Sequence, residues 1–96
     1  MRRKIDLNLE NIVVQNKEID VSDLNGEKVM MNIDKGEYFS LNSLGSRVWE
    51  LIETPRKIND VIDILLKEYE VSEKECKDSV MKFMDVLSYV DLISIN

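Results

Sequence analysis

The residues that form turns are unevenly distributed along this chain, and their distribution limits the folds that it can adopt. The first half holds all three glycines, Gly26, Gly36 and Gly45, whereas the second half holds the only proline, Pro55. Glycine supplies the left-handed backbone of tight turns, and proline ends helices. We therefore expect strands in the first half and helices in the second, in one α+β domain over residues 1–96.

Apolar residues that alternate with polar ones, or that are β-branched, indicate three strands in the first half. These strands are Ile12–Val14, Lys28–Ile33 and Glu37–Leu41. Ile19 and Val21 can extend the pairing of the first strand. Asn25-Gly26 and Asp34-Lys35-Gly36 supply the turns, because these residues tolerate a positive φ. We therefore expect a three-stranded antiparallel sheet.

Three helices are expected after the strands. Helical spacing of apolar residues predicts them over Ser43–Glu53, Asn59–Tyr69 and about Ser72–Val90. Asn42 is the expected N-cap of the first helix, and Ser72 forms a capping box with Glu75 at the start of the third. The tail, residues 91–96, can add a further strand. A small sheet followed by three helices gives a fold like a winged helix-turn-helix, with residues 1–10 as a flexible start.

The third helix carries a wider apolar face than one packing contact needs. Val80, Met84 and Leu87 form the expected core stripe. Further residues extend this face on one side only: Cys76, Ser79, Phe83, Val86 and Val90. Either the sheet or the C-terminal tail covers this flank, or the flank forms a binding groove.

Charge disfavours nucleic acid as a partner. Nineteen Asp and Glu residues against thirteen Lys and Arg residues leave a net charge of -6, which is a poor match to a phosphate backbone. The polar face of the third helix alternates acidic and basic residues, as a solvated face does. A small winged-helix DNA-binding regulator remains the alternative to a peptide-binding module.

Composition also disfavours catalysis, metal binding and membrane insertion. The chain has no His and a single Cys, and it lacks a glycine-rich phosphate loop and an EF-hand pattern. We expect no enzyme activity, no cofactor and no metal. Apolar runs such as Ile12–Val14 are far too short to span a membrane. We expect a cytoplasmic protein in which Cys76 is a reduced thiol.

The last strand can bind a peptide by strand addition. Because side chains alternate along a strand, Phe39 and Leu41 lie on one face of this strand, and Tyr38 and Ser40 lie on the other. An exposed edge strand accepts an extended peptide through its free amides and carbonyls, and a neighbouring apolar helix face can hold the side chains of the peptide. The same free edge could instead pair two copies of the chain as a homodimer.

Two segments resemble the PqqD-like proteins, a family of RiPP recognition elements. Gly36–Asn42, Leu44-Gly45 and Val48–Ile52 are similar to the strand and first helix of that family, and Val71–Ile93 is similar to its third helix. Among these proteins, the chain is most similar to the stand-alone leader-binding proteins of lasso-peptide biosynthesis. It departs from the family at Lys57, where the family has a capping residue, and it lacks the family's proline near Asn42.

The resemblance implies that this chain binds the leader of a precursor peptide. The leader adds an antiparallel strand to Glu37–Leu41 and lies against the third helix, and it is delivered to a leader protease, a macrocyclase or another tailoring enzyme. The implied peptide-binding residues are Tyr38, Phe39, Ser40, Leu41, Cys76, Ser79, Val80, Phe83 and Val86.

Overall fold

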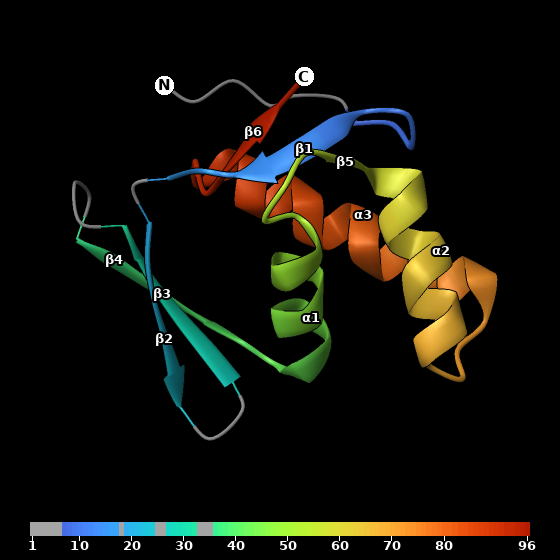
Figure 1. Ribbon diagram of the computed structural model, residues 1–96, viewed down its shortest axis with the longest axis horizontal. Coiled ribbons are helices and arrows are strands. Elements are labelled where there is room, and N and C mark those ends of the chain that lie inside the picture. The colour runs from blue at the N-terminus through green and yellow to red at the C-terminus, as the bar shows by residue number, and fades with distance from the viewer. Residues whose placement is uncertain (1–6, 18, 25–26, 33–35) are drawn as a thin grey trace.

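The computed structural model describes residues 7–17, 19–24, 27–32 and 36–96 (Figure 1). In these ranges the elements follow in the order β1 (Ile12–Gln15), β2 (Ile19–Leu24), β3 (Glu27–Asn32), β4 (Glu37–Leu41), α1 (Ser43–Leu51), β5 (Arg56–Lys57), α2 (Ile58–Glu68), α3 (Glu73–Tyr89) and β6 (Ile93–Ile95). The expected α+β class and the three helices are therefore confirmed. No helix within the described ranges is long and apolar enough to cross a membrane.

The strands form two antiparallel three-stranded sheets, where the sequence predicted one. β2, β3 and β4 form a consecutive meander, whereas the second sheet, in the order β5-β1-β6, joins the two ends of the chain. The expected first strand therefore lies in the second sheet, where Val13 pairs with Ile95 and with Arg56. The chain leaves this sheet at Asn16, whose amide donates to Leu92 O at 3.0 Å, and β2 takes the first position of the meander.

The meander has the register that short turns require. Leu24 pairs with Glu27 across β2 and β3, and Asn32 pairs with Glu37 across β3 and β4. Both expected turns lie largely outside the described residues, at 25–26 and 33–35. Gly36, the last residue of the second turn, has φ +64° and so uses the left-handed conformation expected of it.

The hydrophobic core lies between the three helices and the sheet that contains β1. Its fully buried side chains include Val13 from β1, Ile52 after α1, Leu65 from α2 and Leu87 from α3. Met30 is also fully buried and extends this core to the meander. The meander therefore packs on the helical body through one face, and its other face is open to solvent.

The helix starts follow two different physical rules. Asn42 Oδ1 accepts from Gly45 N at 2.8 Å at the start of α1, and Ser72 Oγ accepts from Glu75 N at 3.1 Å at the start of α3, so both predicted N-caps are confirmed. At the start of α2 the side chain of Lys57 makes no capping bond. Instead, the amides of Ile58 and Asn59 donate to the carbonyls of residues 11 and 9.

The end of α3 directs the chain into β6. Asp91 has φ +61°, its amide donates to Ser88 O, and the amide of Leu92 donates to Leu87 O at 2.9 Å. These two bonds form a Schellman motif, which satisfies the last carbonyls of the helix. Buried Leu87 and Leu92 flank the turn. The C-terminal tail therefore adds the further strand that the sequence allowed.

Candidate functional site

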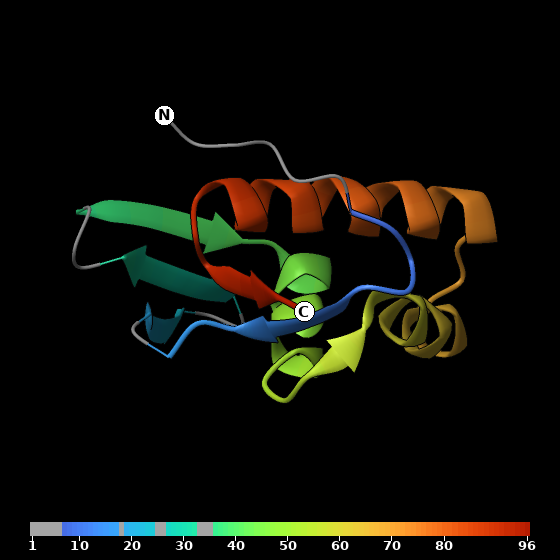
Figure 2. The same ribbon diagram turned by 90° about the horizontal axis from the view of Figure 1, so that it is seen from above.

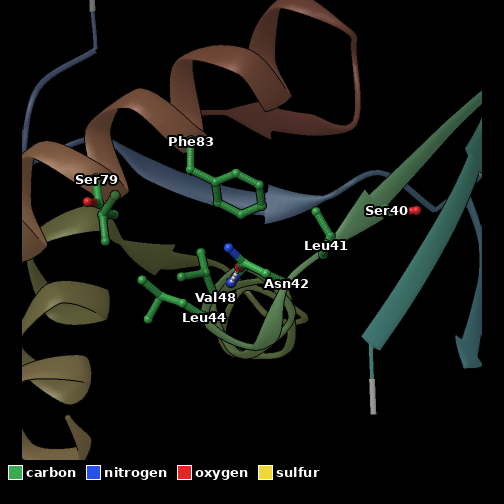
Figure 3. Close-up of a pocket in the computed structure, with 9 residues that line it drawn as sticks. Ser40, Leu41, Asn42, Leu44, Val48, Ser79 and Phe83 are labelled. Carbon is green, nitrogen blue, oxygen red and sulfur yellow. Dashed lines mark hydrogen bonds between the residues drawn. The ribbon is translucent and has the colours of Figure 1, made fainter. Parts of the chain in front are cut away.

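A cavity of about 350 Å³ lies where the end of β4, the first turns of α1 and the middle of α3 meet (Figure 3). Its lining residues are Ser40, Leu41, Asn42, Leu44, Gly45, Val48, Ser79, Val80 and Phe83. Most of the wall is aliphatic or aromatic, and Ser40, Asn42 and Ser79 add polar groups. Such a site suits an apolar group that also needs a few hydrogen bonds to fix its orientation.

β4 leads directly into this cavity and is an edge strand of the meander. It pairs with β3 only, so one edge of β4 has no partner strand in the described part of the chain. Figure 2 shows β4, in green, on the same side of the molecule as α3, in orange and red. Every second residue of an edge strand turns its amide and carbonyl away from its neighbour. β4 thus presents backbone hydrogen-bonding groups beside an apolar cavity.

The side chains of β4 alternate as the sequence predicted. Leu41 is buried and Phe39 is half-buried, whereas Tyr38 and Ser40 are exposed. The buried pair packs toward the core together with Met30, which pairs with Phe39 across the ladder. The inward face of β4 is therefore fixed by packing, and its outward face and free edge can contact a ligand.

Ser46 fixes the end of β4 against α1. This buried serine accepts a hydrogen bond from Lys28 N at 3.1 Å and donates one to Leu41 O at 3.4 Å. Its hydroxyl thus bridges β3 and β4 where Lys28 and Leu41 pair. The helix that forms the floor of the cavity thereby positions the edge strand.

An ion-pair network supports the same junction. Lys28 Nζ donates to Asp23 Oδ1 at 2.9 Å and lies 3.5 Å from Glu50 Oε2. The hydrogen bond to Asp23 is the main reason that the pKa of Lys28 lies above its ordinary value. Arg47 of α1 likewise pairs with Glu68 of α2 at 2.7 Å and lowers the pKa of that carboxyl. These contacts join β2 and β3 to α1, and α1 to α2.

Five of the nine expected peptide-binding residues line the cavity. They are Ser40, Leu41, Ser79, Val80 and Phe83. The other four do not line it. Tyr38 and Val86 are 69% and 55% exposed, Phe39 packs against the core, and Cys76 is buried, with 3% of its surface exposed. Burial raises the pKa of the Cys76 thiol, so it stays protonated at neutral pH. The role of all nine residues in peptide binding stays a prediction.

Four lining residues were absent from the expected set, and all belong to the start of α1. Asn42, Leu44, Gly45 and Val48 form the wall opposite α3. The sequence identified Asn42 as a helix cap, and that role is present. The available signal was the helical spacing of Leu44 and Val48, four residues apart, which places both on the apolar face of α1.

Side chains that can bind a metal ion are not clustered in the described part of the chain. Among the described residues, no group of three Cys, Asp or Glu side chains is arranged to hold a metal ion. Two acidic residues of the helices, Glu50 and Glu68, form ion pairs with Arg47, at 3.3 Å and 2.7 Å. The cavity and the free edge of β4 together form the candidate functional site.

Two solved structures share this fold. The structure described as TbiB1 in complex with the TbiA(beta) leader peptide has 23% identity and a TM-score of 0.77, and the match covers 84% of this chain and 94% of that one. The structure described as lasso peptide synthetase B1 complexed with the leader peptide has 21% identity and a TM-score of 0.75, and the match covers 85% and 96%.

The family is shown by the sequence itself. A search of curated proteins finds no significant match. The family model described as coenzyme PQQ synthesis protein D (PqqD), in contrast, matches residues 27–93, which include β3, β4 and all three helices. This range contains both segments that carried the resemblance, and it makes up more than half of the chain. The chain therefore belongs to the PqqD family, whose members are RiPP recognition elements without catalytic activity.

Proposed function

We propose that this protein binds the leader region of a ribosomally synthesised precursor peptide and delivers it to modifying enzymes. The observation that carries this proposal is the apolar cavity at the end of the free edge strand β4. Membership of the PqqD family supports it, and both solved relatives hold leader peptides. The enzymes that receive the leader are a leader protease and a macrocyclase or another tailoring enzyme.

The leader adds as an antiparallel strand to β4 and lies in the cleft against α3, in an arrangement like that of a winged helix. Backbone hydrogen bonds to Tyr38–Leu41 supply the register and part of the affinity. Successive side chains of an extended peptide point to opposite sides. One of them therefore enters the cavity between Leu41 and Phe83, while its neighbours face solvent or the rim of α3.

Affinity in this cleft comes from apolar burial together with the backbone bonds. The walls supplied by Leu44, Val48 and Phe83 are aliphatic or aromatic, and each square ångström of apolar surface removed from water contributes roughly 25 cal/mol. The net charge of -6 disfavours a DNA duplex in the same place. A peptide strand matches both features of the site, the free strand edge and the apolar cavity.

A charge placed in the cavity tests the proposal. Ser79 is exposed and lines the cavity from α3, so Ser79→Glu puts a carboxylate there without disturbing the core. Its matched control is Ser22→Glu, the same change at an exposed serine of β2 on the other edge of the meander. The measurement is fluorescence polarisation of a labelled leader peptide, chosen from candidate precursors by its binding to the unchanged protein.

Ser79→Glu should weaken leader binding about tenfold or more, equal to about 1.4 kcal/mol, because the carboxylate must be desolvated when the leader covers it. Ser22→Glu should bind the leader as the unchanged protein does. Equal affinities for all three proteins, or equal losses in the two variants, would contradict a leader site in this cleft.

A further inference from the structure

Gly45 has no side chain, which leaves a methyl-sized gap in the wall of the cavity. It lies in the first turn of α1, it is buried, and it faces α3. A Cβ built at Gly45 would lie 3.5 Å from the ring atom Cζ of Phe83 and 3.5 Å from Leu41 Cβ. A methyl group added here would therefore touch both the edge strand and the aromatic wall, and it would narrow the cavity that Gly45 lines.

The backbone gives no reason for glycine at this position. Gly36 is the only described glycine with a positive φ, so Gly45 has a conformation that any residue adopts. Glycine inside a helix is about 0.5–1 kcal/mol less favourable than alanine. The cost of glycine at position 45 is therefore not explained by the fold of α1.

Packing does not require glycine either. Both 3.5 Å distances are ordinary van der Waals contacts. The tightest contact of the added Cβ would be 3.3 Å to Asn42 Oδ1, the oxygen that caps the helix by accepting from Gly45 N. Asn42 is exposed, so it can shift by the few tenths of an ångström that an alanine needs. Alanine would thus fit the protein and would fill only the cavity.

We propose that Gly45 determines specificity, because its missing side chain sets the largest leader side chain that the cavity accepts. This inference rests on the proposed leader binding and adds which chemical class of side chain is selected. The cavity of about 350 Å³ has mostly apolar walls, so the selected side chain is large and apolar. It packs against the wall that Gly45, Leu41 and Phe83 form together.

Phe83 limits the same space from the opposite side. Its half-buried ring reaches from α3 toward α1, as Figure 3 shows. Because Phe83 and a residue at position 45 would share one volume, their effects on selectivity should be coupled. Gly45→Ala should favour smaller leader side chains, and Phe83→Leu should favour larger ones.

The test measures side-chain preference and not only affinity. Short fluorescein-labelled peptides are selected from a random-sequence display library against the unchanged protein, and an alanine scan of the tightest binder identifies its anchor residue. The anchor is then replaced by Trp, Phe, Leu, Val and Ala. Each peptide is titrated by fluorescence polarisation against the unchanged protein, Gly45→Ala, Phe83→Leu and the double variant. Thermal unfolding of each protein controls for stability.

Gly45→Ala should weaken binding of the Phe-anchored peptide roughly tenfold or more, because one added methyl group occupies the space of the anchor. Binding of the Ala-anchored peptide should change by less than about twofold. Phe83→Leu should shift the preference toward Trp, and the double variant should recover binding of the Phe-anchored peptide. Gly45→Ala should unfold at the same temperature as the unchanged protein or at a higher one.

Two outcomes separate the failure of this inference from the failure of the proposed function. If the unchanged protein binds peptides but Gly45→Ala alters all five affinities in the same proportion, or none, then Gly45 does not set specificity. If no selected peptide and no leader binds the unchanged protein, both the inference and the proposed function are wrong.

Discussion

The two three-stranded sheets of this protein are built in opposite ways. In β5-β1-β6 the central strand pairs with two strands from distant parts of the chain, and Val13 and Ile93 are buried in the core. In the meander β2-β3-β4 each strand pairs with the next one along the chain. Val21 lies opposite the fully buried Met30 in the ladder, yet it is 40% exposed. The sheet β5-β1-β6 closes the core, whereas much of the meander extends away from it.

This difference separates stability from binding. Long-range pairing joins β1 to the C-terminal segment. Ile12 N donates to Asn96 O at 3.3 Å, and Asn96 N donates to Ile12 O at 2.8 Å. The meander is held mainly at one end, through Ser46 and the pairs of Lys28, and this leaves the edge of β4 free. We therefore expect substitutions in β5-β1-β6 to affect folding, and those along the free edge of β4 to affect peptide binding.

The largest expected effect on stability is that of Leu92→Ala. Leu92 is fully buried between α3 and β6, so the cavity left by its truncation should cost about 2–5 kcal/mol in the free energy of unfolding. The comparison variant is Tyr38→Ala in β4, where 69% exposure predicts a change within about 0.5 kcal/mol. Urea unfolding gives both values. The proposed separation of stability from binding is wrong if Tyr38→Ala destabilises the protein as much as Leu92→Ala does.

A smaller loss is expected at the junction between the meander and α1. Ser46→Ala removes the hydroxyl that accepts from Lys28 N and donates to Leu41 O, and it should cost about 1–3 kcal/mol because buried groups lose their partner. It should also weaken leader binding, since the end of β4 is no longer fixed. Ser43→Ala, at an exposed serine of the same helix, is the control for both measurements. Unchanged stability of Ser46→Ala would show that the junction does not hold the meander.

The smallest expected effects on stability concern two residues with a left-handed backbone, Gly36 before β4 and Asp91 before β6. Gly36→Ala before β4 should destabilise the protein by about 1 kcal/mol, because alanine disfavours φ +64°. Asp91→Gly before β6 should stabilise it by up to about 1 kcal/mol, since glycine relieves a φ of +61° in the Schellman motif. Thermal unfolding detects both shifts. Shifts of the same sign would contradict the backbone explanation.

Local patterns in the sequence were sufficient to predict the helices. α1 and α3 begin at the caps that Asn42 and Ser72 predict, and α2 begins at Ile58, one residue before the expected start. The exception has a long-range cause, because carbonyls of residues 9 and 11 accept the first amides of α2. The second sheet was missed for the same reason: its pairs join residues from opposite ends of the chain, and no local pattern encodes them.

The candidate site was predictable on one side only. Helical periodicity correctly placed Ser79 and Phe83 on the wall that α3 contributes. It could not separate them from Cys76, which the core covers, or from Val86, which extends beyond the cavity. The wall from α1, including Gly45, depends on how α1 packs against α3, and local patterns in the sequence do not reveal that arrangement.

Residue-resolved amide hydrogen exchange, with and without leader peptide, tests the central claim most directly. The claim is that the leader pairs with the free edge of β4 and not with β2, the other edge of the meander. At a leader concentration about 100 times its Kd, alternate amides of Glu37–Leu41 should exchange up to about 100-fold more slowly, while those of Ile19–Leu24 are unchanged. Slower exchange in β2, or unchanged exchange in β4 while the leader is bound, would contradict the claim.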